Sequence, residues 1–204
     1  MNINLIRAAA MAVLFSVAGY RGYSQGTFVN LGFENPVLPL TPVNSEVPIT
    51  NGLPGWVGYI AGDQVDHVLY NTVSIGAAAI SLQGPGSLAP VLEGNYSAIL
   101  QCSFGGLNSA AIGQTGQIPL DAQSLVFFEQ NFGSLNVTFA GQPISLVRLG
   151  SGANYDIIGG DISAFAGQTG ELRFITAPNS SGVLDYIQFS NQVVPCQRSV
   201  KTSQ

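Results

Sequence analysis

Short apolar runs separated by turn residues dominate the chain from residue 26 onward. The runs are rich in Val, Ile, Leu, Phe, Tyr and Thr, and the separators are Gly, Pro, Asn and Ser. This spacing is typical of a β-sandwich or barrel and not of alternating strands and helices. The pattern predicts strands over residues 27–33, 55–60, 66–70, 77–82, 97–103, 110–114, 124–130, 135–140, 142–149, 155–159, 170–176 and 183–190.

The clearest alternation of apolar and polar positions lies between residues 134 and 149. Leucine, valine, phenylalanine or isoleucine takes every second place on both sides of a turn at 140–143. Because successive side chains of a strand point to opposite faces, this pattern predicts a hairpin with one apolar face. A single helical turn is predicted at 161–167, with Asp161 as its N-cap and Gly167 as its C-terminal stop.

The composition narrows the class of protein further. Only 8% of the 204 residues are charged, 46% are hydrophobic, and the mean hydropathy is +0.31. A disordered chain combines low hydrophobicity with high net charge, so this composition excludes intrinsic disorder. A helical bundle would need an Ala, Glu, Lys, Leu and Arg surface that the chain lacks. Since no linker or charge block interrupts residues 25–195, we predict one domain over that range.

The first 24 residues have the pattern of a secretory signal peptide. Arg7 precedes an uncharged apolar run at 8–19, which is too short to cross the roughly 30 Å hydrocarbon core of a bilayer. Gly22 and Ser24 place small residues at −3 and −1 before Gln25, which predicts cleavage after Ser24. Earlier cleavage after residue 18 and a buried amino-terminal helix are the alternatives. The pattern predicts a secreted protein, extracellular or at the cell surface.

Removal of such a leader leaves a strongly acidic domain. Residues 25–195 keep all eleven acids and only two basic residues, Arg148 and Arg173, so the net charge is 2 − 11 = −9 with histidine neutral. Binding to a phosphate backbone needs clustered Lys or Arg, so nucleic acid is excluded as a partner. Purely electrostatic binding to anionic lipid is excluded for the same reason. Neutral sugars, divalent cations and other proteins stay open.

Three motifs resemble one fold family. The run N-L-G-F-E-N-P at 30–36, followed by L-P-G-W at 53–56, is similar to the opening of galactose-binding-like jelly rolls, the architecture of many non-catalytic carbohydrate-binding modules. The run L-D-Y-I-Q-F at 184–189 resembles their closing strand, and D-I-S-A-F-A-G-Q-T at 161–169 with L-R-F at 172–174 resembles an intervening segment. The resemblance implies an all-β, antiparallel jelly-roll β-sandwich of galactose-binding-like type.

A second resemblance concerns cellular address. The leader, the Gly-rich β domain, the run I-G-Q-T-G-Q-I-P at 112–119 and the ending V-V-P at 193–195 resemble secreted bacterial proteins with a PEP-CTERM sorting signal. That signal continues with Glu-Pro, a membrane helix and a basic cluster, whereas this chain continues with C-Q-R-S-V-K-T-S-Q at 196–204. We expect a disordered tail there and no stable membrane span in this chain. Either the anchor was lost by frameshift or truncation, or the short tail is natural.

The residues needed for common enzyme chemistry are missing. His67 is the only histidine, and no G-x-S-x-G or HExxH motif occurs. Glycoside hydrolysis needs only two carboxylates, so a glycoside hydrolase stays open as the least favoured function. Together with the resemblance to carbohydrate-binding modules, this predicts a non-catalytic β-sandwich that binds carbohydrate or matrix exopolysaccharide. The main alternative is a purely structural surface or matrix protein without a small ligand.

The candidate metal ligands follow from the resemblance to carbohydrate-binding jelly rolls. Those domains often bind calcium with the acid of F-E and the acid of L-D, which correspond to Glu34 and Asp185. Calcium takes several hard oxygens and could join the first and last strands. The alternative is that Glu34 caps a loop and Asp185 accepts backbone N–H bonds.

Trp56, Tyr59 and Tyr70 are the candidate ligand-binding residues. Trp56 is the only tryptophan, and with the two tyrosines it could form a flat apolar face on which a sugar ring stacks. In such domains a tryptophan soon after the first strand is usually in the core, which is the alternative for Trp56. A disulfide between Cys102 and Cys196 is possible, and the oligomeric state is left open.

Overall fold

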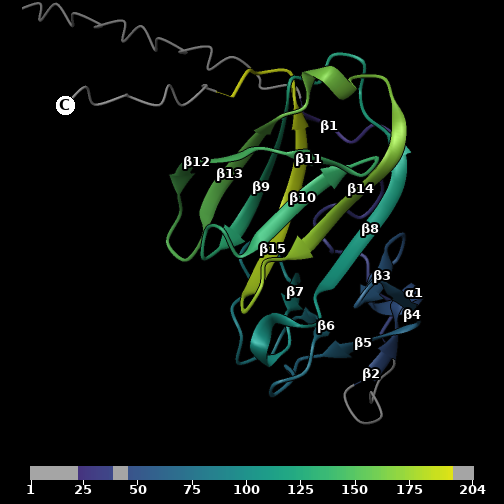
Figure 1. Ribbon diagram of the computed structural model, residues 1–204, viewed down its shortest axis with the longest axis vertical. Coiled ribbons are helices and arrows are strands. Elements are labelled where there is room, and N and C mark those ends of the chain that lie inside the picture. Colours follow the sequence, from purple (N-terminus) through teal and green to yellow (C-terminus); the bar gives the residue numbers. More distant parts are fainter. Residues whose placement is uncertain (1–22, 39–45, 195–204) are drawn as a thin grey trace, which may run out of the picture.

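The computed structural model describes residues 23–38 and 46–194. These residues form a β-sandwich of two sheets packed face to face (Figure 1). The predicted all-β sandwich is therefore confirmed. Residues 1–22 of the predicted signal peptide, the tail at 196–204 and Cys196 lie outside the described residues, so the predictions made for them stay predictions. The last two residues of that predicted peptide, Tyr23 and Ser24, form a short strand paired with residues 189–190. Cys102 is half-buried. No helix among the described residues is long and apolar enough to cross a membrane.

The larger sheet has nine strands. They are β1 (Tyr23–Ser24), β2 (Glu46–Pro48), β5 (His67–Tyr70), β6 (Ala79–Gln83), β7 (Ser97–Gln101), β9 (Ser124–Gln130), β12 (Leu146–Ser151), β13 (Asp156–Asp161) and β15 (Ser181–Ser190). Their order is β12-β13-β9-β15-β7-β6-β5-β2, with β1 also paired to β15. The pairing of β5 with β6 is parallel, and the other pairings in this sheet are antiparallel.

The smaller sheet has six antiparallel strands. They are β3 (Val57–Ile60), β4 (Asp63–Val65), β8 (Ala110–Gln117), β10 (Leu135–Phe139), β11 (Gln142–Ile144) and β14 (Thr169–Thr176), in the order β11-β10-β14-β8-β3-β4. Consecutive strands from β8 to β15 cross repeatedly between the two sheets, which is the wrapping expected of the predicted jelly roll. The helical elements are short: α1 (Ile49–Gly52), η2 (Phe104–Gly106) and η3 (Ser163–Phe165).

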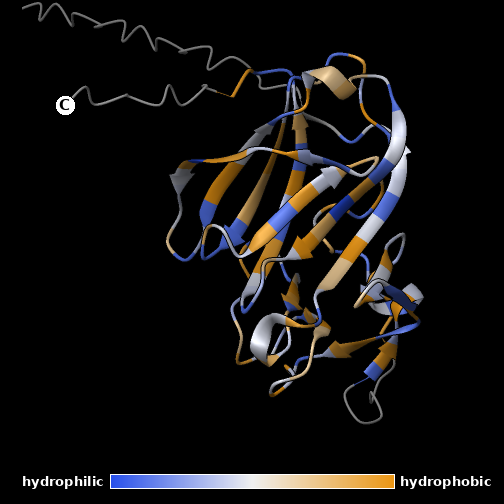
Figure 2. Ribbon diagram, viewed as in Figure 1, coloured by the Kyte–Doolittle hydropathy of each residue, from blue (hydrophilic) through white to orange (hydrophobic). Residues whose placement is uncertain are grey.

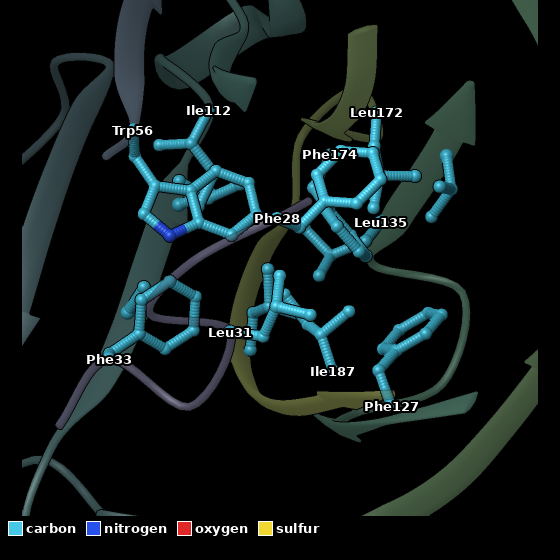
Figure 3. Close-up of a cluster of buried hydrophobic side chains, with 14 of the residues drawn as sticks. Phe28, Leu31, Phe33, Trp56, Ile112, Phe127, Leu135, Leu172, Phe174 and Ile187 are labelled. Atoms are coloured by element: carbon cyan, nitrogen blue, oxygen red, sulfur yellow. The ribbon is translucent and has the colours of Figure 1, made fainter. Parts of the chain in front are cut away.

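One continuous apolar core fills the space between the sheets. Along β10 the buried residues Leu135, Val137 and Phe139 alternate with outward-facing Asn136 and Thr138. Figure 2 shows the same alternation of hydrophobic and hydrophilic residues on β10 and β14. Burial of each large apolar side chain contributes about 1.5–3 kcal/mol, so this core supplies most of the stability of the sandwich. Figure 3 labels Phe28, Leu31, Phe33, Trp56, Ile112, Phe127, Leu135, Leu172, Phe174 and Ile187 in it.

The segment at 27–33 is not the predicted strand. Phe28, Leu31 and Phe33 enter the core, but Val29 is exposed. Asn30 and Phe33 have φ angles of 52° and 58°, which break an extended backbone. The side-chain amide of Gln114 replaces a neighbouring strand, because its Oε1 accepts from Val29 N at 2.6 Å and its Nε2 donates to Val29 O at 2.9 Å. The apolar residues at 27–33 therefore belong to an irregular segment. Its backbone is hydrogen-bonded by the Gln114 side chain and not by a neighbouring strand.

The predicted strand at 142–149 divides into two. β11 completes the predicted hairpin, in which Phe139 pairs with Gln142. After Ile144 the chain crosses to the other sheet and continues as β12. The predicted helical turn is the 3-10 helix η3, where Asp161 Oδ1 accepts from Ser163 N at 2.9 Å, and Gly167 follows with a φ of 76°. Strands β1, β2 and β4 are additional to the prediction.

Candidate functional site

Trp56 lies in the core, which was the alternative to a ligand-binding position for this residue. It is 3% exposed, and its ring packs 5.6 Å from that of Phe33 and 6.2 Å from that of Phe174. Its Nε1–H donates to the carbonyl of Asn30 at 3.1 Å, and the Asn30 side chain donates to Pro54 O at 3.1 Å. The N-x-G-F-E and P-x-W motifs thus bind each other, and Trp56 offers no ring face to a ligand.

Tyr59 and Tyr70 lie on different sheets, so the three aromatic residues do not form the common flat face that was predicted. Tyr70 is on β5 of the nine-stranded sheet, where it packs partly buried against the core. Tyr59 is on β3 of the six-stranded sheet and faces away from the core, because its neighbour Gly58 points inward against Ile49 and Ile80.

Tyr59 belongs to a cluster of three side chains on the outer face of the six-stranded sheet. The Tyr59 hydroxyl donates to Glu171 Oε1 at 2.9 Å, and the Arg173 guanidinium carbon lies 4.0 Å from the centre of the Tyr59 ring. Arg173 Nη2 donates to Glu171 Oε1 at 3.0 Å and lies 2.8 Å from Oε2. We call Tyr59, Glu171 and Arg173 the Tyr59 cluster.

The strand between Tyr59 and the other two residues allows the cluster to form. β8 separates β3 from β14, and its Gly113 pairs with Arg173. A Cβ at position 113 would overlap Glu171 Oε1, so only a glycine lets the Glu171 side chain lie across β8 and reach Tyr59. The neighbouring Ala111, which pairs with Tyr59, is also small. Small residues on the middle strand therefore leave room for the polar side chains of the flanking strands.

The charges of the cluster are balanced. Burial raises the pKa of Tyr59, and its bond to Glu171 raises it further, so the hydroxyl stays protonated near neutral pH. Burial lowers the pKa of Arg173, but the hydrogen bond and charge of Glu171 outweigh that effect and raise it overall. Arg173 Nε is buried and has no hydrogen-bond partner among the described residues. The cluster can therefore offer donors and acceptors side by side without net charge.

Further polar side chains extend the cluster across the sheet. Thr138 on β10 pairs with Arg173, and exposed Gln64 on β4 pairs with Tyr59. Exposed Asn136 stands beside Thr138 on the same outer face. The five strands from β10 to β4 span about 19 Å at the usual spacing of neighbouring strands. Thr138, Asn136 and Gln64 thus share the outer face with the Tyr59 cluster, and the small or apolar residues Gly113, Ala111, Val57 and Ile175 lie between them.

Glu34 and Asp185 are both anchored to the loop 93–97. Glu34 Oε1 accepts from Asn95 N at 2.8 Å and Tyr96 N at 2.9 Å, and its Oε2 accepts from Asn95 Nδ2 at 3.3 Å. Asp185 Oδ2 accepts from Glu93 N at 3.0 Å and Ser97 Oγ at 2.6 Å. These bonds are those of the loop-capping alternative, and they place both acids beside one loop.

The site at Glu34 and Asp185 carries uncompensated negative charge. Burial, with a smaller contribution from the charge of Glu34, raises the pKa of Asp185 to about 7 against the lowering effect of its hydrogen bonds. None of the ion pairs among the described residues involves either acid. A cation therefore fits the charge of this site. Calcium takes six to eight oxygens, and no group of three or more His, Cys, Asp or Glu occurs in the described part of the chain, so backbone carbonyls or water would complete its shell.

Glu171 and Arg173 were missed as site residues. The sequence held one signal for them: Arg173 is one of only two basic residues in 25–195, and it alternates with buried Leu172 and Phe174. Within the part of the chain that the structure describes, the His67 side chain hydrogen-bonds only its neighbour Asp66, with Nδ1 and Oδ1 2.8 Å apart on the surface.

Comparisons with known proteins give only distant structural likenesses. No family model and no curated protein matches the chain. A family 11 carbohydrate-binding module from Clostridium thermocellum, in complex with a β-1,3-1,4-mixed-linked tetrasaccharide, is 11% identical, with a TM-score of 0.37, over 74% of this chain and 97% of that one. TmCBM61 in complex with β-1,4-galactotriose is also 11% identical, with a TM-score of 0.37, over 81% of this chain and 98% of that one. At this TM-score the likenesses assign neither family nor ligand.

Proposed function

We propose that the protein is a non-catalytic carbohydrate-binding domain, with its ligand lying across the outer face of the six-stranded sheet. The observation that carries this proposal is the Tyr59 cluster, in which an aromatic ring, a carboxylate and a guanidinium lie together on a solvent-facing sheet. All three side chains are held by one another, so little conformational freedom is lost when a ligand binds.

The chemistry of the cluster favours a neutral saccharide. Neighbouring hydroxyls of a sugar both donate and accept hydrogen bonds, and the Arg173 fork and the Glu171 carboxylate match these two roles. The cluster has no net charge, and no other basic residue of 25–195 lies near it, since Arg148 pairs with Asp156. An anionic polysaccharide is a less suitable ligand, because the domain is acidic and the charge of Arg173 is already partly neutralised by Glu171.

A glycan array followed by calorimetric titration tests the proposal. The intact protein should bind a neutral oligosaccharide, and Tyr59→Ala or Arg173→Ala should each weaken that binding at least about tenfold. Tyr70→Ala is the matched control, because Tyr70 is also half-buried but lies on the other sheet. Equal affinity of Tyr59→Ala and the wild type would place the ligand elsewhere. Absence of any bound glycan would favour a purely structural surface or matrix protein.

Calcium is proposed as a structural ion of the same domain. Glu34 and Asp185 would hold it beside the loop 93–97, where it would neutralise the two carboxylates. We further propose that the protein is exported and acts at the cell surface or in an exopolysaccharide matrix, as PEP-CTERM-type proteins do. Support for that address comes from the leader pattern at 1–24 and from the resemblance at 112–119 and 193–195.

A further inference from the structure

The outer face of the nine-stranded sheet carries a groove of about 560 Å³. It lies on β9, β12, β13 and β15, and its remaining wall is the segment that leaves β15. Leu125 and Phe127 of β9 point into the core, so Val126 and Phe128 between them point out into this groove. Its lining residues are Ser124, Val126, Phe128, Leu149, Ile157, Tyr186, Gln188, Ser190, Gln192, Val193 and Val194. This volume is within the range of small-molecule sites.

Three stacked aromatic rings border the groove. The Phe128 ring lies 4.1 Å from that of Tyr155 with an angle of 11° between the planes, and 4.6 Å from that of Tyr186 with an angle of 23°. Phe128 is thereby buried between the two tyrosines, whereas Tyr186 stays half-exposed and lines the groove. A rigid aromatic surface of this kind suits the apolar face of a pyranose ring.

Tyr186 is held in a conformation that is unfavourable for a bulky residue. Its φ is 51°, and it lies in the bulge of β15 between Asp185 and Gln188. Asp185 Oδ1 accepts from Tyr186 N at 2.7 Å, which fixes the backbone there. Strained backbone of this type is concentrated at ligand sites, where it sets the direction of a side chain. Here the bulge directs the Tyr186 ring to the stack beside the groove.

The polar lining of the groove has unused hydrogen-bonding capacity and no formal charge. The side-chain amide of Gln188 has no hydrogen bond within the described residues, and the Gln192 amide donates only to Asn191 next to it. The hydroxyls of Ser124 and Ser190 are already engaged, since Ser124 Oγ donates to Gln192 O at 2.8 Å and Ser190 Oγ accepts from Gln192 N at 3.1 Å, so the two amides carry the free capacity. In a domain with a net charge of −9 over 25–195, an uncharged groove with free amides is suited to a neutral ligand rich in hydroxyls.

We propose that this groove is a second binding site for a neutral saccharide, in which Tyr186 stacks on a sugar ring and Gln188 binds its hydroxyls. The inference rests on the proposed function of the domain, but it concerns a different sheet from the Tyr59 cluster. Two sites on opposite faces make the domain bivalent, so that one molecule can link two polysaccharide chains.

Calorimetric titration of the full chain with the oligosaccharide retained on the glycan array tests this inference. We expect two saccharides per wild-type chain and one per Tyr59→Ala/Arg173→Ala chain. Addition of Tyr186→Asn to that double variant should lower the remaining affinity at least about tenfold, because it removes the ring and keeps a residue suited to positive φ. Val126→Trp, which fills the groove without removing the stack, should have the same effect. Circular dichroism and thermal unfolding show whether each variant is folded.

The outcomes separate the two sites. One saccharide per wild-type chain, lost with Tyr59→Ala, would overturn the second site and leave the proposed function intact. Binding that is lost with Tyr186→Asn alone and unaffected by Tyr59→Ala would support the groove and overturn the Tyr59 cluster as a site. If the groove binds saccharide only after residues 195–204 are deleted, the tail is its occupant and the inference is wrong.

Discussion

The Tyr59 hydroxyl donates a hydrogen bond of 2.9 Å to Glu171 Oε1, although 112 residues separate the two in the chain. The bond crosses a whole strand, since β8 lies between β3 and β14. It is possible because Gly113 of β8 has no side chain beneath the Glu171 carboxylate. The arrangement of the Tyr59 cluster thus depends on Gly113, which is not one of the three residues of the cluster.

Gly113→Ala should therefore weaken saccharide binding without unfolding the protein. The new Cβ would displace the flexible end of Glu171 and break its bond to Tyr59. We expect about tenfold weaker binding by calorimetry, the loss of one or two hydrogen bonds to a charged group. Gly150→Ala is the matched control, because its Cβ would meet nothing closer than Ile157 at 3.8 Å and lies on the other sheet. Unchanged affinity of Gly113→Ala would mean that the ligand does not use the cluster.

Asn30 should be one of the most sensitive residues for stability. Its side chain bonds Pro54 O and Asn35 N, its carbonyl accepts from Trp56, and its φ is 52°. Asn30→Ala loses the side-chain bonds and is also strained at this φ, so we expect a loss of about 2–4 kcal/mol in the free energy of unfolding. Asn30→Gly loses the bonds alone and should cost about 1 kcal/mol less. Urea unfolding measures both, and equal losses would show that the φ angle is unimportant.

Asp185 should make the calcium-free protein less stable as the pH rises toward neutrality. Its pKa is raised from an ordinary value near 3.8 to about 7, so the folded state binds a proton more tightly than the unfolded state. Its contribution to stability is complete below about pH 4 and is lost as the pH rises through about 7. Asp185→Asn should remove the part of this dependence that Asp185 causes and leave the part due to buried Glu129, whose pKa burial also raises. The pKa of exposed Asp161 is lowered, so its contribution to stability is lost as the pH falls, which is the opposite direction. Asp161→Asn should remove that loss at low pH. Urea unfolding across this pH range, in chelator, measures both.

Calcium should raise the melting temperature at slightly alkaline pH, where Asp185 is ionised. A ligand that binds only the folded state stabilises it by about 2.7 kcal/mol at a hundred times its dissociation constant. Chelator should reverse the effect, and Glu34→Ala should abolish it. Glu46→Ala is the control, because Glu46 is an exposed acid on β2. A calcium response that survives Glu34→Ala would remove Glu34 from the proposed ligands.

The exported protein should begin at or near Gln25. The apolar run at 8–19 and the small residues Gly22 and Ser24 fit the geometry that signal peptidase requires. Amino-terminal sequencing of protein recovered from the culture medium measures this directly. Recovery of an intact chain beginning at Met1 from a membrane fraction would contradict the prediction.

The alternation of apolar and polar residues was enough to predict most of the strands. β9 is found at 124–130 as predicted, and the hairpin of β10 and β11 follows from the pattern on both sides of the turn at 140–143. The resemblance of the opening motif also gave a core position as the alternative for Trp56, which is where this residue lies. The strands and the hairpin depend on a local turn and on the two-residue period of a strand, which is visible in any window of sequence.

Which strands are neighbours was decided only by the tertiary structure. The Tyr59 cluster requires β3 and β14 to flank β8 in one register, and the groove requires the bulge that turns Tyr186 toward Phe128. The pattern of a single strand states which of its residues are apolar but not which strands lie beside it. Burial of the whole core selects that order. The sequence by itself therefore determined the sandwich and its faces, and the long-range packing determined which polar and aromatic side chains meet on them.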